Sequence, residues 1–354
     1  MKNKKILITG SLGLIGFETT LFFLEKGFDV IGIDNNLREK IFNINTQYKD
    51  KLSFLQNSHR KNYLHYKYDI RDKNKIDDLF KTYGKNLYVI VHTAAQTSHD
   101  WSIKDPFLDF SVNSQGTLNL LESFRTFSPH STFIFTSTNK VYGDLINSFD
   151  FKEYTNRYDL PQKHLHFEGI DEKFSIDQSM HSLFGVSKTS ADLMVQEYGR
   201  YFSLKTGVFR LGVITGGGQS ASFYQGFLSY MIEKLINNEK FSIIGYKGKQ
   251  VRDILHAKDA AKAFYLFSQK PGVGEVFNLG GGRKNSFSIK ELIKKSKSLS
   301  GRVLRTEYTK TPRNGDHKWW ITDISKFKKS FPEWKPSVNI DDILSEIYKT
   351  YESR

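Results

Sequence analysis

The sequence feature that most constrains the fold is a glycine-rich turn near the start of the chain. A predicted strand at residues 5–9, which is apolar at residues 6–8, leads directly into Gly10, Gly13 and Gly16. Isoleucine and leucine favour a strand buried on both faces, and glycines let the backbone turn sharply and approach a diphosphate without Cβ clashes. The N–H groups of the helix expected from residue 14 to about residue 26 would point at that diphosphate. The pattern predicts a dinucleotide-binding strand, turn and helix.

A second apolar run, at residues 30–33, ends in Asp34. A carboxylate at the tip of this strand can accept hydrogen bonds from an adenosine ribose, and its charge would repel a 2′-phosphate, so we expect NAD rather than NADP as the cofactor. Arg38 lies close by in sequence and weakens this preference slightly. The cofactor contacts predicted from this first segment are Gly10, Leu12, Gly13, Leu14, Ile15, Gly16, Asp34 and Asn35.

The alternation of apolar runs with helical spacing predicts an α/β protein with a doubly wound parallel sheet of the Rossmann type. At 354 residues the chain is longer than one hydrophobic core usually serves, and a glycine run at 216–218 marks a break in composition. We therefore expect an NAD-binding domain at residues 1–211, to which a segment at about 252–280 returns. A smaller α/β domain at residues 212–354 would bind the substrate.

Composition excludes several classes of protein. The chain has 38% hydrophobic residues and only seven prolines, which argues against disorder, and no apolar segment approaches the roughly 18 residues of a membrane span. Cysteine is absent, which fits a reducing compartment, so we expect a cytoplasmic protein. The net charge of +14 comes from scattered lysines. We expect solvated faces that attract an anionic nucleotide, and no nucleic-acid partner.

Further strands bring polar residues to the same edge of the sheet. Asp69 follows the third strand, where its carboxylate could meet an adenine amino group or cap a helix, and small residues after the strand at 87–92 leave room for a cofactor. Asn113 is either a cofactor contact or a satisfied buried amide. We expect residues 35–62 to be a long insertion with no clear period. The cofactor contacts predicted here are Asp69, Ile70, Thr93, Ala94, Ala95, Gln96 and Asn113.

The strand predicted at residues 132–136 delivers a run of hydroxyl and polar side chains that includes Thr138 and Asn139. In open α/β sheets, chemistry takes place at the carboxyl ends of the strands, so these side chains are candidates for the active site. Helical spacing returns at residues 182–202, a segment that contains Lys188.

A polar loop at residues 147–179 lies between these two elements and could cover a substrate. His164 and His166 alternate with a leucine in this loop, and Asp171 is near in sequence. A metal site needs more ligands than this, so we expect no bound metal.

With these residues in view, the chain resembles the extended short-chain dehydrogenases/reductases of the nucleotide-sugar epimerase and dehydratase type over nearly its whole length. Within that family, the strings STNKVYGD and KQVRD resemble epimerases of CDP-linked deoxysugars. A dehydratase would carry Asp and Glu after the threonine, where this chain has Asn139 and Lys140. The resemblance rests on GSLGLIG at 10–16, Asp34, Asp69 with Ile70, HTAAQ at 92–96, TSTNKVYG at 136–143, Lys188, KQVRDILH at 249–256, FNLGG at 277–281 and RNGD at 313–316.

The resemblance implies a redox epimerisation for the synthesis of surface polysaccharide, in which NAD removes a hydride from a sugar carbon and returns it to the other face. Thr138 matches the hydroxyl that orients the sugar, and Lys188 matches the lysine that holds the nicotinamide ribose and lowers the pKa of the base. Relatives commonly form homodimers through the helices expected here at 107–127 and 182–202. By resemblance, Thr136 and Lys188 also contact the cofactor, and Thr138, Asn139, Arg252 and Arg313 contact the nucleotide sugar.

The chain departs from the family at the residue that should act as the base. Family members carry YxxxK, whereas Phe184 here stands four residues before Lys188, and a phenyl ring cannot take a proton. His181, one helical turn earlier, is our candidate for the catalytic base, with Lys188, Tyr142 and Asp177 as further candidates. The alternatives are a protein that binds NAD and a nucleotide sugar without turnover, and a related redox reaction at another carbon.

Overall fold

Seven strands form the central sheet of the structure, a computed structural model that describes residues 4–222, 226–313 and 315–353. In order across the sheet, the strands are β12 (Glu275–Leu279), β8 (Lys205–Leu211), β5 (Thr132–Thr138), β4 (Leu87–His92), β1 (Lys5–Thr9), β2 (Asp29–Ile33) and β3 (Tyr63–Tyr66). The pairs from β3 to β5 are parallel. Because the chain winds outward from β1 in both directions, the sheet is doubly wound, and the Rossmann-type fold predicted from the sequence is confirmed.

The register of the central strands aligns their carboxyl ends. Thr9, the last residue of β1, pairs with Ile33 at the end of β2 and with His92 at the end of β4. The residues that follow these strands therefore emerge at one edge of the sheet. The strand order reverses between β1 and β4. Open α/β sheets bind their ligands at this edge, next to such a reversal.

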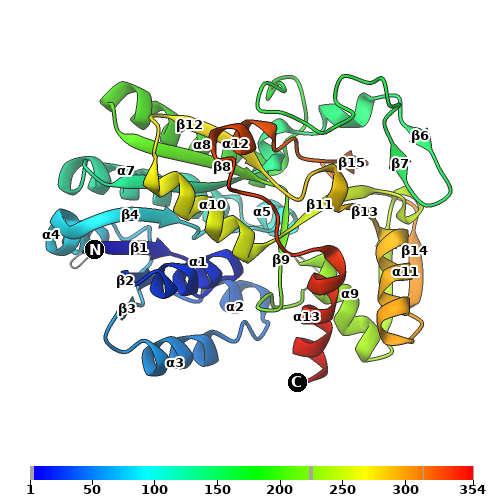
Figure 1. Cartoon of the computed structure of the whole chain (residues 1–354), viewed down its shortest axis with the longest axis horizontal. Coiled ribbons are helices and arrows are strands. Elements are labelled where there is room, and N and C mark those ends of the chain that lie inside the picture. The colour runs from blue at the N-terminus through cyan, green and yellow to red at the C-terminus, as the bar shows by residue number, and fades with distance from the viewer. Residues whose placement is uncertain (1–3, 223–225, 314, 354) are drawn as a thin grey trace. The chain divides into compact units, whose positions relative to one another are not determined.

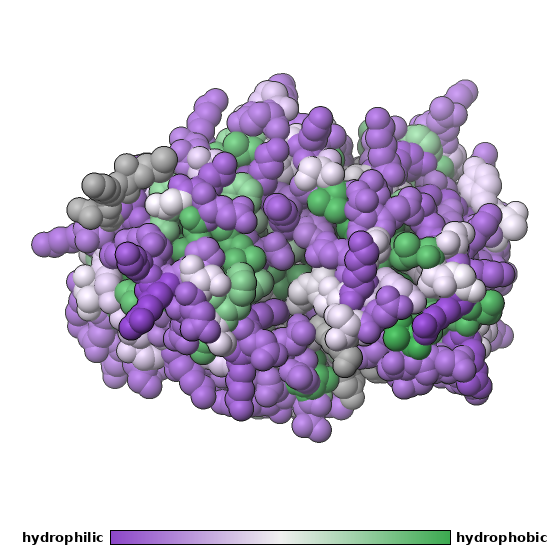
Figure 2. Space-filling model, turned by 60° about the horizontal axis from the view of Figure 1, so that its bottom comes forward, coloured by the Kyte–Doolittle hydropathy of each residue, from purple (hydrophilic) through white to green (hydrophobic). Residues whose placement is uncertain are grey.

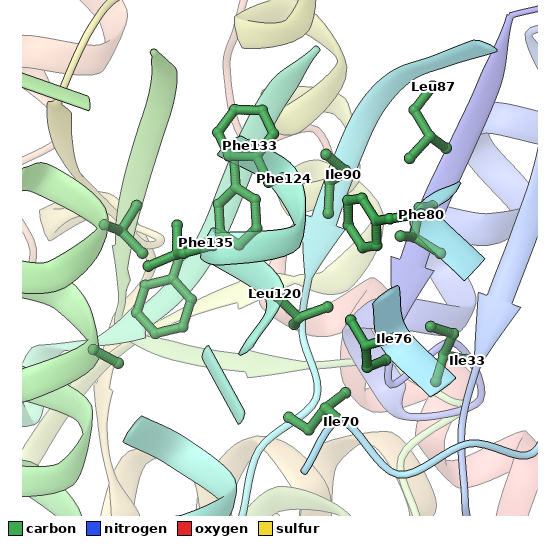
Figure 3. Packing of buried hydrophobic residues seen from close by; sticks show 14 of the residues in the cluster. Ile33, Ile70, Ile76, Phe80, Leu87, Ile90, Leu120, Phe124, Phe133 and Phe135 are labelled. Carbon is green, nitrogen blue, oxygen red and sulfur yellow. The ribbon is translucent and has the colours of Figure 1, made fainter. Parts of the chain in front are cut away.

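Helices pack on this sheet through a core of aliphatic and phenylalanine side chains. Figure 3 shows Phe133 of β5 and Phe124, whose ring centroids are 5.4 Å apart, with Phe80 and Ile90 close by. All four are fully buried. The helices are α1 (Leu14–Glu25), α2 (Leu37–Phe42), α3 (Tyr48–Ser58), α4 (Lys73–Tyr83), α5 (His99–Lys104), α6 (Pro106–Phe110), α7 (Gly116–Phe127), α8 (Ser182–Phe202) and α10 (Ala257–Gln269).

The segment at residues 35–62, predicted as an insertion with no clear period, contains the two helices α2 and α3. The reason is visible in α3, where only Lys51 and Leu55 among eleven residues are buried. A helix that buries so little has no apolar stripe in its sequence, so its periodicity could not be detected.

The helix predicted at residues 107–127 is interrupted. Between α6 and α7, the segment Ser111–Gln115 forms a π-helical turn in which Val112, Asn113 and Ser114 are buried. Such turns are rare and occur mostly as single turns inside α-helices, often at functional sites.

The chain divides into two compact units (Figure 1). The domain boundary predicted at residue 211 describes this division only in part, because residues 139–182 group with the second unit. The reason is that Val141 and Tyr142 from this segment share a hydrophobic core with Trp319 and Trp320. The first unit comprises Met1–Thr138, Leu183–Arg210 and Ala260–Phe277, and the second comprises Asn139–Ser182, Leu211–Asp259 and Asn278–Arg354.

The second unit is also of mixed α/β structure. Its larger sheet is built around β11 (Val251–His256), which pairs with antiparallel β13 (Ser286–Ser288) and with parallel β15 (Trp319–Trp320) and β9 (Val213–Thr215). The remaining elements are the strand pairs β10 (Lys240–Ile244) with β14 (Arg305–Thr309) and β6 (Lys152–Glu153) with β7 (Tyr158–Asp159), and the helices α9 (Phe227–Ile236), α11 (Ile289–Ser300), α12 (Ser325–Ser330) and α13 (Ile340–Glu352).

Hydrophilic side chains cover most of the face seen in Figure 2, and hydrophobic side chains form separate patches on it. None of the helices among the described residues is long and apolar enough to cross a lipid bilayer.

Candidate functional site

The turn after β1 leaves no space for a Cβ at Gly10 or at Gly16. Gly10 has a φ of +67°, a conformation that glycine adopts at little cost. A Cβ on Gly10 would lie 2.8 Å from the backbone nitrogen of Ala94, and a Cβ on Gly16 would lie 2.0 Å from the carbonyl oxygen of Gly10. α1 begins directly behind Gly13, which has no side chain to cap it. The first N–H groups of such a helix are suited to binding a diphosphate.

Asp34 is held at the tip of β2 by backbone N–H groups. Its Oδ2 accepts a hydrogen bond from Leu12 at 3.0 Å, and its Oδ1 accepts one from Asn36 at 2.8 Å. Burial raises the pKa of Asp34, while these hydrogen bonds and the charge of Lys51 oppose the rise. Because a carboxylate oxygen can accept more than one hydrogen bond, both oxygens can still bind ribose hydroxyls.

Lys51 is a residue of this region that the sequence analysis did not identify. It is buried on α3, and its Nζ donates a hydrogen bond to the carbonyl oxygen of Leu12 at 3.2 Å. The lysine thus ties α3 to the glycine turn. Its sequence neighbourhood offers no signal for this, because the contact depends on the folding of a helix that the periodicity does not reveal.

The segment after β4 is fixed beside the glycine turn. The Oγ1 of Thr93 donates a hydrogen bond to the carbonyl oxygen of Thr9 at 2.7 Å, and the N–H of Ala94 donates to the Oγ1 of Thr9 at 3.2 Å. The structure therefore brings together two segments that were predicted separately to hold the cofactor, the turn after β1 and the small residues after β4.

Asp69 lies in a polar cluster with Asn35 and Arg71. Its carboxylate accepts hydrogen bonds from the Nδ2 of Asn35 at 2.9 Å and from the Nη2 of Arg71 at 2.7 Å. Burial alone would raise the pKa of Asp69, but the hydrogen bonds and charge of Arg71 bring it below its usual value. The neighbouring Ile70 packs its side chain into the hydrophobic core, so any cofactor contact of Ile70 uses its backbone.

The side-chain amides of Asn113 and Gln96 were predicted as cofactor contacts. In the structure they form hydrogen bonds within a buried polar network. The Oδ1 of Asn113 accepts from the N–H of Gln96 at 2.9 Å, and its Nδ2 donates to the carbonyl oxygen of Gln96 and to the Oγ of Ser187, both at 3.0 Å. The Nε2 of Gln96 donates to Asp109 at 2.5 Å. Both side chains are 1% exposed. They are satisfied buried amides, the alternative that the sequence left open for Asn113.

Lys188 is buried on α8 and lies beside the end of β5. Its Nζ donates a hydrogen bond to the carbonyl oxygen of Thr136 at 2.8 Å and lies 4.1 Å from the ring centroid of Phe135. Burial lowers the pKa of Lys188 to about 7, although the carboxylates of Asp192 and Asp109 oppose the change. A buried amine with such a pKa is typical of functional sites.

Phe184 is also buried on α8, one turn before Lys188, and is 7% exposed. The imidazole of His99 lies against its ring, with the two ring centroids 5.0 Å apart and the ring planes inclined by 59°. The sequence analysis did not identify His99. No local signal points to it, since its position beside Phe184 results from the packing of two segments that are far apart in the chain.

In the second unit, the KQVRD and RNGD segments meet. The Nη2 of Arg252 donates to the Oδ1 of Asp316 at 2.5 Å, and the Nζ of Lys140 donates to the carbonyl oxygen of Gly315 at 2.7 Å. Burial lowers the pKa of Lys140 to about 8. Arg313 begins the same segment and is half-buried. Asn139, which directly follows Thr138 at the end of β5, is 8% exposed.

His181 is held within the second unit through both nitrogens of its ring. Nδ1 lies 3.3 Å from the carbonyl oxygen of Lys140, and Nε2 lies 3.4 Å from the Oγ of Ser179. His164 and His166 pack with the ring of Phe149 in the polar loop. Within the described parts of the chain, no three histidine or acidic side chains gather in a way that could hold a metal ion.

The comparisons with known proteins agree with three features of this site. Gly10 and Gly16 leave no space for a Cβ, Asp34 places a carboxylate at the end of β2, and Lys188 is buried beside β5. The family model described as "NAD dependent epimerase/dehydratase family" matches residues 6–280. The chain belongs to this family. It is an enzyme whose cofactor is NAD, and the glycine turn and the Asp34 carboxylate fit that cofactor.

Three relatives illustrate the similarity. The CDP-paratose 2-epimerase of Salmonella typhi is 35% identical over 97% of this chain and 98% of its own length. The UDP-glucuronate 4-epimerase of Thermodesulfobacterium geofontis is 28% identical over 96% of this chain and 93% of its own. A crystal structure of the UDP-glucose 4-epimerase of Thermotoga maritima with UDP-glucose superimposes with a TM-score of 0.78 at 27% identity, and covers 99% of both chains.

Proposed function

We propose that the protein epimerises a CDP-linked deoxysugar by transient oxidation and re-reduction of one sugar carbon, for the synthesis of surface polysaccharide. The observation that carries the proposal is the 35% identity with a CDP-paratose 2-epimerase over 97% of the chain. Asn139 and Lys140 support epimerisation over dehydration, because the acidic pair that drives elimination in the related dehydratases is absent from these positions. The nucleotide and the carbon attacked are part of the proposal.

NAD, when bound, would take up a hydride from the sugar and return it. The turn between β1 and α1 would hold its diphosphate through backbone N–H groups, and Asp34 would accept hydrogen bonds from its adenosine ribose. Lys188 would hold the nicotinamide ribose. The residues of this proposed cofactor site are Gly10, Leu12, Gly13, Leu14, Ile15, Gly16, Asp34, Asn35, Asp69, Thr93, Ala94, Ala95, Thr136 and Lys188.

Thr138 would orient the reacting hydroxyl of the sugar, because it is the last residue of β5 and is only half-buried. Arg252 and Arg313 would bind the diphosphate of the nucleotide sugar, since guanidinium groups match the geometry of phosphate oxygens. Asp316 would hold the guanidinium of Arg252 in place, through the 2.5 Å hydrogen bond between them.

The enzyme would act in the cytoplasm as a homodimer. Large hydrophobic side chains are exposed on α6 and α8, among them Phe107 at 88%, Phe110 at 49%, Leu183 at 46% and Val186 at 48%. Side chains of this kind on neighbouring turns favour association with a second apolar surface. They lie within the segments 107–127 and 182–202, through which the family resemblance predicts pairing.

The experiment is an incubation of the purified protein with NAD and CDP-paratose in D₂O, followed by ¹H NMR. The proposal predicts a second CDP-sugar that is inverted at one carbon. Because the hydride is returned from the cofactor and does not come from solvent, the inverted carbon should still carry protium. Failure to convert CDP-paratose and other CDP-deoxysugars, by a protein that binds NAD, would refute the proposal.

A further inference from the structure

We propose that His99 is the proton acceptor that takes the place of the missing tyrosine hydroxyl. This inference rests on the proposed epimerisation. Phe184 stands where the YxxxK pattern has tyrosine, and its ring offers no atom that can hold a proton. The imidazole of His99 lies against that ring at a centroid separation of 5.0 Å. The structure thus places a titratable side chain against the ring that stands in place of the tyrosine.

The loop that carries His99 is held rigidly from the end of β4. The Oε1 of Gln96 accepts a hydrogen bond from the N–H of Ser98 at 2.5 Å, and the Nε2 of Gln96 donates to the carbonyl oxygen of Ser98 at 2.9 Å. Ser98 then caps α5, its Oγ accepting from the N–H of Trp101 at 3.2 Å. His99 is the first residue of this helix, so its backbone is fixed on both sides.

The same buried network holds the helix of Phe184. The carboxylate of Asp109 accepts from the Nε2 of Gln96 through one oxygen and from the Oγ of Ser187 through the other, both at 2.5 Å. Ser187 lies one turn after Phe184 and is fully buried. The loop of His99 and the helix of Phe184 are therefore attached to one carboxylate, and the two rings are held in a fixed relation.

Histidine has the chemistry that the step needs. A neutral imidazole carries one nitrogen with a free lone pair, which accepts a proton near neutral pH. In the oxidation, the O–H bond of the sugar hydroxyl breaks and its proton forms an N–H bond on His99. The bonding electrons become the second bond of the carbonyl as the hydride leaves the carbon for NAD. On re-reduction, the same N–H returns its proton to the oxygen.

His181, the base predicted from the sequence, is less suited to this role. Its Nδ1 and Nε2 lie close to the carbonyl oxygen of Lys140 and the hydroxyl of Ser179, which accounts for both ring nitrogens. Its ring therefore has a structural role within the second unit.

Kinetics of four variants test the proposal with the full-length protein, NAD and CDP-paratose. His99→Gln should lower kcat by about 100-fold or more, as for loss of a general base, with the unfolding midpoint and the NAD affinity unchanged. His130→Gln, a control at an exposed histidine of the same unit, should keep the full rate. Adding Phe184→Tyr to the His99→Gln variant should raise its kcat at least tenfold. A His99→Gln protein with the wild-type rate, or a 100-fold loss confined to His181→Gln, overturns the proposal.

A second measurement does not depend on turnover. Diethyl pyrocarbonate modifies neutral imidazoles, and peptide mapping by mass spectrometry reports the extent at each histidine. With NAD present, CDP-paratose should slow modification of His99 at least fivefold and CDP alone should not, because the proposed contact is with the sugar. Equal modification with and without the sugar overturns the inference, whereas protection without conversion of any CDP-sugar refutes the proposed function and leaves His99 in the sugar site.

Discussion

The Nζ of Lys188 donates a hydrogen bond to the carbonyl oxygen of Thr136 across 2.8 Å, at the place where β5 delivers Thr138 to the edge of the sheet. Because this amine is buried, its pKa falls from the ordinary 10.5 to about 7. The folded protein therefore holds the proton of Lys188 more weakly than the unfolded chain does.

This relationship predicts a pH dependence of stability. Between pH 7 and about 10.5, the unfolded chain carries a proton on Lys188 that the folded chain has lost, so the free energy of unfolding rises with pH in this window. Below pH 7, the cost of burying the charge is present in full. Lys188→Met removes the titrating group, so its stability relative to the wild type should be highest at pH 6 and decline toward pH 10. Urea unfolding of the NAD-free proteins measures this difference, and a constant difference would contradict the assignment.

Gly16→Ala should disrupt the cofactor turn. The new Cβ would lie 2.0 Å from the carbonyl oxygen of Gly10, a backbone atom that cannot move without displacing the turn. We expect a loss of about 1–3 kcal/mol of stability and at least a tenfold weaker binding of NAD by calorimetry. The control is Gly218→Ala, since a Cβ on Gly218 meets nothing within 4 Å. Wild-type affinity in the Gly16 variant would show that the turn does not hold the cofactor.

Asp34→Ser should relax the choice between NAD and NADP. The serine keeps a hydroxyl at the tip of β2 but removes the charge that would repel a 2′-phosphate. The ratio of the two dissociation constants should shift toward NADP by about tenfold or more, which corresponds to about 1.4 kcal/mol. An unchanged ratio would place the cofactor selectivity elsewhere, with Arg38 and Lys51 as the neighbouring cations to examine next.

Arg252→Ala should weaken binding of the nucleotide sugar and leave NAD binding intact. The guanidinium is held by Asp316 and is proposed to bind the diphosphate, so its loss should raise KM for the CDP-sugar by roughly tenfold to a hundredfold, as for a charge-assisted hydrogen bond. Arg302→Ala is the matched control on an exposed arginine of the same unit. Equal KM values in the two variants would remove Arg252 from the substrate site.

The elements with strong local signals could be predicted from the sequence. β1, β4 and α8 begin and end at the residues predicted for them, because their apolar runs and helical spacing are bounded by glycine and polar residues. The position of Asp34 directly after the second strand was likewise predicted. The family resemblance supplied what periodicity cannot, namely the roles proposed for Thr138 and Lys188.

The features that the sequence did not reveal depend on tertiary packing. α3 was missed because it buries almost no apolar surface. Asn113 was predicted as a cofactor contact with a satisfied buried amide as the open alternative, and its amide joins Gln96 to Ser187. The contact between His99 and Phe184 has no counterpart in sequence spacing. For Asn113 and His99, the partners Ser187 and Phe184 lie far away in the chain.

The interleaving of the two units has a practical consequence for the enzyme. The chain crosses from one unit to the other after Thr138, Ser182, Arg210, Asp259 and Phe277, so neither unit is a continuous segment. A fragment that stops at residue 211 would lack β12. The backbone N–H and C=O groups along one side of β8 would then be unpaired, and such an exposed edge strand promotes aggregation. Truncation at residue 211 therefore leaves the central sheet incomplete, and the polypeptide has to be synthesised as far as β12 before this sheet can form in full.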